Sequence, residues 1–136
     1  MAPKAEPLPT LREFLDEPYG VHGDRAFVSH PGWGMLYVRR TRRFLDNTWV
    51  FPVLDLARIE AVHPNQGTFT RLLKYLRRMY PHYTIYVESV QTERFIERLL
   101  KLGFVRVQEG SASLYLFPND SKTMEKVTVK KDKKKE

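Results

Sequence analysis

The sequence contains no cysteine, and this excludes disulfide bonds, thiolate zinc sites and cysteine nucleophiles. It contains no apolar run near the roughly 20 residues that a membrane-spanning helix needs. Its first residues, MAPKAEP, lack the apolar stretch of a secretory signal peptide. No internal repeat is visible. These absences favour a cytoplasmic protein that is not inserted in a membrane.

The 136 residues suffice for one domain of ordinary size. With 42% hydrophobic and 12% aromatic residues the chain can bury a core, so global disorder is not expected. Three prolines and little apolar pattern indicate a flexible segment over residues 1–9. We predict a single domain over residues 10–117, followed by a lysine-rich flexible tail over residues 118–136.

The net charge of +7 is concentrated at one end of the chain. Residues 121–136 hold seven lysines against Glu125, Asp132 and Glu136, and so carry four of the net positive charges. A run of this kind is usually a solvated, disordered segment. The alternative is an arm that binds the phosphates of a nucleic acid.

The apolar pattern predicts an α/β (α+β) fold with a mixed sheet. A short helix should begin after Thr10, which forms a capping box with Glu13. Alternating or β-branched runs predict strands over residues 26–28, 35–40, 49–62, 83–87, 104–107 and 113–117. Helical spacing predicts one helix from Phe69 to Met79 and a second from Thr92 to Leu102.

The order of these elements fixes how the strands should pair. The first strands are expected to be antiparallel, and a strand, a helix and a strand in succession predict one parallel βαβ crossover. The last two strands should form a hairpin across Gly110. The long strand is apolar on both faces from Val53 onward, which predicts helices on both sides of the sheet.

The turn over residues 63–70 is the clearest candidate for a ligand-binding site in the sequence. It places Gly67 at the opening of a helix that follows a central strand, where unpaired amides and a partial positive charge can bind a pyrophosphate. Thr68 or Thr70 could add a hydroxyl group. The alternative is a plain turn in which the glycine serves only geometry.

Several motifs resemble those of the GCN5-related N-acetyltransferases. Residues 62–67 (VHPNQG), followed by Leu72 and Leu73, are similar to the family's strand, pyrophosphate loop and helix. Residues 86–88 (YVE) and 102–104 (LGF) are similar to its second strand and the end of its second helix. Residues 37–40, 54–59, 94–95 and 113–115 are similar to short acetyltransferase-like proteins of tailed bacteriophages, which act in the cytoplasm of the bacterial host.

The resemblance implies that acetyl-CoA lies between the two parallel strands, with an amine as the acceptor and without a metal. Its pantetheine arm would pair with the first strand, and its diphosphate would lie on the following loop. The implied cofactor-binding residues are Ile59, Ala61, Val62, Asn65, Gln66, Gly67, Thr68, Phe69, Thr70 and Thr92.

The same resemblance implies direct attack of the amine on the thioester. Glu60 is the candidate general base because it ends the central strand near the expected gap, and Glu88 is the second candidate. A solvated strand end is the alternative role for Glu60. Leu99 stands where the family often has the tyrosine that protonates the leaving thiolate, so Tyr115 is the candidate acid, with Tyr86 or solvent as alternatives.

The histidines and the arginines form two further patterns. The four histidines are irregularly spaced and predict no metal site. Residues 37–44 (YVRRTRRF) bracket four arginines with two aromatic residues, which is typical of a stacking surface for nucleic acid. Because strand alternation divides these arginines between two faces, a basic sheet edge is the plainer interpretation.

Two hypotheses follow. The first is an acetyl-CoA-dependent N-acetyltransferase that acts on an amine. The second is a non-catalytic protein on the same fold that binds a host protein or a nucleic acid, with the lysine-rich tail as an auxiliary arm.

Overall fold

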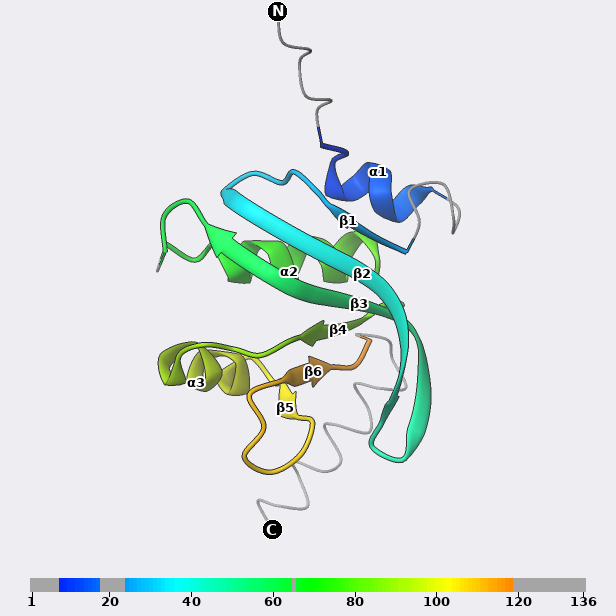
Figure 1. Cartoon of the computed structure of the whole chain (residues 1–136), viewed down its shortest axis with the longest axis vertical. Coiled ribbons are helices and arrows are strands. Elements are labelled where there is room, and N and C mark those ends of the chain that lie inside the picture. Colours follow the sequence, from blue (N-terminus) through cyan, green and yellow to red (C-terminus); the bar gives the residue numbers. More distant parts are fainter. Residues whose placement is uncertain (1–7, 18–23, 65, 119–136) are drawn as a thin grey trace, which may run out of the picture.

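Six strands form one mixed sheet in the order β1-β2-β3-β4-β6-β5, shown in Figure 1. The computed structural model describes residues 8–17, 24–64 and 66–118. Its elements are α1 (Leu11–Asp16), β1 (Arg25–Phe27), β2 (Trp33–Leu45), β3 (Thr48–Ala61), α2 (Thr68–Met79), β4 (Thr84–Val87), α3 (Glu93–Lys101), β5 (Val105–Arg106) and β6 (Leu114–Leu116).

The sheet confirms the predicted mixed α+β architecture. β3 and β4 run parallel, whereas β1–β2, β2–β3, β4–β6 and β5–β6 are antiparallel. The long hairpin of β2 and β3 turns at Asp46 and Asn47, whose φ angles of 50° and 59° suit a tight two-residue turn. The predicted C-terminal hairpin is present as β5 and β6.

The helices of the described residues all lie on one face of the sheet, so our prediction of helices on both sides is wrong. Leu54 and Leu56 of β3 belong to the same core cluster as the buried residues of α1, α2 and α3. The cause is topological. Strands β3, β4 and β5 are parallel to one another and advance in one direction across the sheet. Crossovers of the usual hand therefore put α2 and α3 on the same side.

The opposite face explains why β3 is apolar on both sides. Val53 and Tyr115 pack there with Leu45 and Tyr86 in a second, smaller cluster. Over the described ranges, no helix contributes to this cluster. We call this side of the sheet the helix-free face.

The ends of the helices follow the sequence signals. Thr10 and Glu13 form the predicted capping box: the Glu13 amide donates to Thr10 Oγ1 at 3.0 Å, and Glu13 Oε1 accepts from the Thr10 amide at 3.3 Å. Thr92 caps α3 by accepting from the Phe95 amide at 3.2 Å. Gly103 follows α3 at φ 101°, as predicted for the residue that ends this helix.

Candidate functional site

A cleft opens where the two parallel strands separate. Their pairing ends at Leu56 and Val87, and the Glu88 amide makes one further bond to the Leu56 carbonyl at 3.4 Å. Beyond this point lies a cleft of about 550 Å³. Its lining residues come from β2, β3, the segment after β4 and α3: Met35, Leu56, Ala57, Arg58, Ile59, Glu60, Val87, Glu88, Ser89, Val90, Gln91, Thr92 and Phe95. The volume is within the range typical of small-molecule sites.

Two local irregularities cause the separation. In β3, Leu56 lies opposite Val38 and Arg58 lies opposite Tyr37, so Ala57 is an extra residue that forms a β-bulge. After β4, Ser89 adopts a left-handed conformation with φ 44°. A bulge bends the strand that contains it, and a left-handed residue turns the chain, so the two segments diverge.

The segment after β4 is held away from β3 by a different part of the chain. The Ser89 amide donates to Ser113 Oγ at 3.0 Å, and the Val90 amide donates to the Ala112 carbonyl at 2.8 Å. Because of these bonds, no described strand pairs with the cleft-facing edge of β3 between Ala57 and Ala61. Backbone groups on that edge are therefore available to an extended ligand.

The beginning of α2 adjoins this cleft. Phe69, in the first turn, packs edge to face against Phe95 of the cleft wall, with ring centroids 5.2 Å apart. Gly67 precedes the helix at φ 75°, no side chain caps the first turn, and the first turn contains no acidic residue. The unpaired amides and the helix dipole make this end of α2 favourable for an anion.

Arg71 adds a full positive charge at the same place. Its Nη1 donates to the Gln66 carbonyl at 2.8 Å, and its Nη2 lies 3.4 Å from Thr68 Oγ1. These contacts hold the guanidinium over the first turn of α2. Sequence reasoning missed Arg71, although its position four residues after Gly67 places it on the first-turn side of the helix.

The two candidate bases differ in their surroundings. Glu60 lies opposite Met35 on the helix-free face and is exposed at the cleft, and no described residue forms an ion pair with it. Glu88 is ion-paired with Arg39, so one of its oxygens already accepts a hydrogen bond. Glu60 is therefore the better placed of the two carboxylates to accept a proton.

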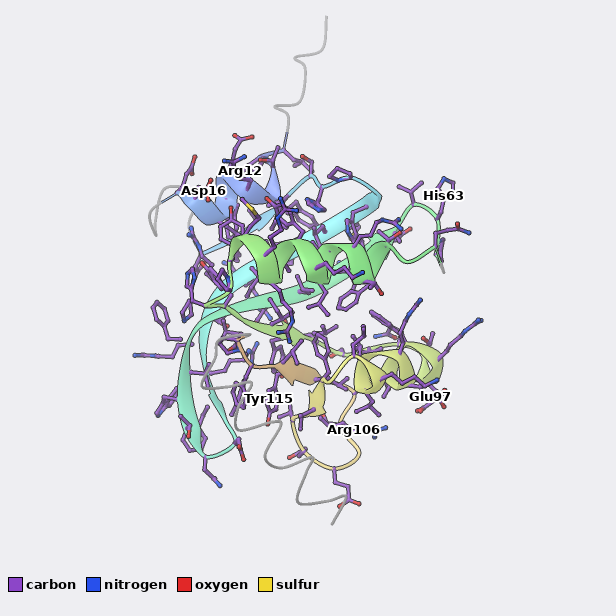
Figure 2. All side chains as sticks on the ribbon, turned by 180° about the vertical axis from the view of Figure 1, so that it is seen from behind. Arg12, Asp16, His63, Glu97, Arg106 and Tyr115 are labelled. Atoms are coloured by element: carbon purple, nitrogen blue, oxygen red, sulfur yellow. The ribbon has the colours of Figure 1, made fainter. Side chains whose placement is uncertain are left out.

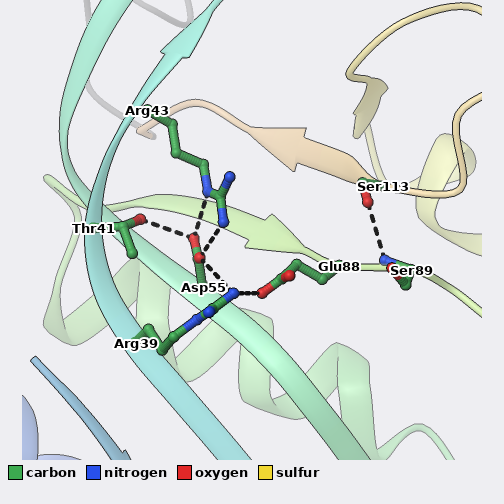
Figure 3. Close-up of polar contacts among 7 residues, drawn as sticks. All are labelled: Arg39, Thr41, Arg43, Asp55, Glu88, Ser89 and Ser113. Carbon is green, nitrogen blue, oxygen red and sulfur yellow. Dashed lines mark hydrogen bonds and ion pairs between the residues drawn. The ribbon is translucent and has the colours of Figure 1, made fainter.

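Arg39 also belongs to a buried ionic network, drawn in Figure 3. Asp55 is fully buried and accepts from Arg43 Nε at 3.0 Å, Arg43 Nη2 at 2.6 Å and Thr41 Oγ1 at 2.9 Å. Arg39 Nη2 lies 3.5 Å from Asp55 Oδ2. The bond to Asp55 raises the pKa of Arg43. The network joins β2, β3 and the end of β4 immediately before the strands separate.

The structure brings part of the predicted site together. Ile59, Glu60 and Thr92 line the cleft. The remaining predicted cofactor residues lie outside the lining: Ala61 ends β3, Val62 and Gln66 are exposed in the following loop, and Gly67, Thr68, Phe69 and Thr70 form the start of α2. Asn65 lies outside the described residues.

Tyr115 is not brought to Glu60. It is buried on the helix-free face beside Tyr86, its partner across β4 and β6, and burial raises the pKa of its hydroxyl. It is absent from the cleft lining, and in Figure 2 it lies on β6, away from His63 and the loop before α2. Leu99 is a fully buried core residue of α3. Tyr115 pairs with Tyr86, which precedes the point where β3 and β4 separate, so it lies outside the cleft although it shares a face with Glu60.

No family model, curated protein or solved structure matches this chain. Within residues 8–17, 24–64 and 66–118, no three His, Asp or Glu side chains gather as a metal site requires. None of the helices in these ranges is long and apolar enough to span a membrane.

Proposed function

We propose that the protein is an acyl-CoA-dependent N-acetyltransferase of the GCN5-related type that acts in the cytoplasm on a primary or secondary amine. The observation that carries this proposal is the cleft between β3 and β4, with an unpaired strand edge on one wall and the uncapped start of α2 beside it. An elongated ligand with amide groups at one end and a diphosphate at the other matches both features.

Two parts of acetyl-CoA, the pantetheine arm and the diphosphate, would have a counterpart in the site. The two amides of the pantetheine arm would pair with the edge of β3 between Ala57 and Ala61, as an added strand does. The diphosphate would accept from the amides at the start of α2 and from Arg71. Gly67 suits this position because it has no side chain between the helix end and the phosphates.

The reaction needs one base and no covalent intermediate. The acceptor amine attacks the thioester carbonyl, the new C–N bond forms, and the C–S bond breaks to release the coenzyme A thiolate. Glu60, directly or through a water molecule, takes the proton that the amine loses. Because Tyr115 lies away from the cleft, we assign protonation of the thiolate to solvent.

Cofactor binding is tested by thermal shift with coenzyme A, since a ligand that binds only the folded state raises the melting temperature. Gly67→Asp should abolish the shift because it adds a carboxylate where the diphosphate lies. Gly67→Asn is the matched control. Aspartate and asparagine both tolerate a left-handed backbone, but asparagine carries no charge. No shift with the unaltered chain at millimolar coenzyme A would refute the proposal and leave the non-catalytic hypothesis. An equal shift for both variants would refute the diphosphate position.

Turnover is tested by incubating the protein with acetyl-CoA and a panel of amines and measuring released thiol. Because the chain has no cysteine, every thiol detected comes from coenzyme A. Glu60→Gln should lower kcat by about 10²- to 10⁴-fold, the usual contribution of a general base, and leave coenzyme A binding unchanged. A Glu60→Gln variant as active as the original chain would exclude Glu60 as the base.

A further inference from the structure

The tip of the β2–β3 hairpin projects beyond the other strands, as Figure 1 shows. β4 pairs with β3 only from Val53 onward, so residues 42–51 form a two-stranded ribbon. Three large aromatic side chains on this ribbon are exposed: Phe44 by 56%, Trp49 by 65% and Phe51 by 62%. Aromatic residues of this size are usually buried, so three exposed ones within one short ribbon indicate a binding surface.

The ribbon has one packed face and one open face. Leu45 and Val50 pack against Tyr86 and Tyr115. Phe44 and Trp49 are direct cross-strand partners on the other face, with ring centroids 5.5 Å apart in an edge arrangement. In the part of the chain that the structure describes, no helix residue joins this face.

A cation accompanies the aromatic pair. The guanidinium carbon of Arg42 lies 5.5 Å from the centroid of the Trp49 ring. The neighbouring arginines do not join it: Arg43 is bound to Asp55, and Arg40 is buried over the Phe14 ring at 4.5 Å. The expected division of the arginine run is therefore confirmed: Arg39 and Arg43 lie on the side of Asp55, and Arg40 and Arg42 lie on the other side, where Arg42 contacts Trp49.

The sequence that follows the last described residue, Pro118, is rich in lysine. Phe117 packs against the cluster that contains Leu45 and Val50, so the polypeptide leaves the sheet at the base of the ribbon. The seven lysines between residues 122 and 135 follow in the sequence and lie outside the described residues. The whole chain carries a net charge of +7 with a pI near 9.7.

We propose that Phe44, Trp49 and Arg42 form a stacking surface for single-stranded nucleic acid. The lysines after Pro118, which lie outside the described residues, add to the attraction of the chain for the phosphates. Stacking on exposed aromatic rings combined with basic groups along the backbone is how such strands are bound without sequence preference. The charge of the chain decides between partners: a polyanion with exposed bases complements both the rings and the lysines, whereas an ordinary protein surface complements only the rings. This site is separate from the cleft and does not depend on acetyltransferase activity.

The test uses a fluorescently labelled oligothymidylate of about 15 nucleotides, the full-length chain, and anisotropy at several salt concentrations. Trp49→Ala should weaken binding about 5- to 150-fold, which is the usual loss of one stacked base. Trp49→Phe should restore most of the affinity because it keeps a ring. Phe27→Ala, which removes an exposed ring (45%) on β1 away from the ribbon, is the matched control and should leave affinity unchanged.

Two further measurements separate the parts of the surface. In a Trp33→Phe background, Trp49 is the remaining tryptophan, and its fluorescence should be quenched on binding if a base stacks on it. Changing the seven tail lysines to glutamine should lower the slope of log K against log salt by up to about 5 and leave the quenching in place.

Three results would overturn the proposal. The first is the absence of binding at low salt. The second is binding that depends on the lysines but is equal for Trp49→Ala and the unaltered chain, because the ribbon would then take no part. The third is a dimer in light scattering that Trp49→Ala dissolves while nucleic-acid affinity stays unchanged, because a second copy would then cover the rings.

Discussion

Replacing Asp55 by asparagine should destabilise the fold strongly, although the two side chains have nearly the same shape. Asp55 is fully buried and receives hydrogen bonds from Arg43 and Thr41, with Arg39 3.5 Å away. Asparagine keeps one acceptor oxygen but loses the negative charge. Arg43 would then lose its carboxylate partner, whereas Arg39 would keep its ion pair with Glu88.

The size of the loss follows from the burial of the three groups. Removing one partner of a fully buried ion pair costs about 3–5 kcal/mol. The side chains of Arg39 and Arg43 are 31% and 29% exposed, so water recovers part of their solvation. We therefore expect a decrease of about 2–3 kcal/mol in the free energy of unfolding. For a chain of this length that corresponds to a Tm lower by about 8–12 °C.

Urea denaturation followed by circular dichroism measures this loss. The matched control is Glu60→Gln, the same carboxylate-to-amide change on the same strand at an exposed position without a described ion pair. It should change the unfolding free energy by less than about 0.5 kcal/mol. If Asp55→Asn costs as little as Glu60→Gln, the network does not stabilise the fold, and its role must be sought elsewhere.

Three other predictions concern single residues. Arg71→Gln should weaken coenzyme A binding about 10-fold without lowering Tm by more than a degree or two, measured by calorimetry and thermal shift. Ser89→Val should cost about 1–2 kcal/mol in urea denaturation because a β-branched residue resists a φ of 44°, whereas Ser89→Gly should cost nothing or stabilise. Burial and a hydrogen bond to Asp16 raise the pKa of Tyr80. Tyr80 therefore stays protonated when unfolded tyrosines ionise, and stability should fall above about pH 10, by up to about 1.4 kcal/mol per pH unit, less steeply in Tyr80→Phe.

Local signals in the sequence predicted the elements well. The capping box at Thr10, the helical spacing from Phe69 to Met79 and the glycine after α3 each act over a few residues, so they can be read without knowing the rest of the fold. The parallel pairing of β3 and β4 was also predictable, because a strand–helix–strand order permits little else.

The features that open the cleft were harder to predict. The bulge at Ala57 has one signal in the sequence. Apolar residues fall at Leu54, Leu56 and Ile59, so the alternation of apolar and polar residues shifts by one position. The left-handed conformation of Ser89 has no signal in the sequence, because serine has no preference for that conformation. The hydrogen bond between Ser89 and Ser113 links residues that are far apart in sequence. A site created by such long-range contacts cannot be read from local pattern.

The buried network and the cleft are two parts of one arrangement, and this leads to a last prediction. Arg39 and Asp55 are cross-strand partners on β2 and β3, and Arg39 also pairs with Glu88 at the point where β4 leaves β3. Tight pairing before that point and free backbone after it are what give the cleft a fixed width. Asp55→Asn should therefore weaken coenzyme A binding at temperatures where the variant is still folded, although Asp55 does not line the cleft. Glu60→Gln, which changes the lining but not the network, should bind coenzyme A normally. If calorimetry shows unchanged affinity for Asp55→Asn, the width of the cleft is set by the bulge and Ser89 alone.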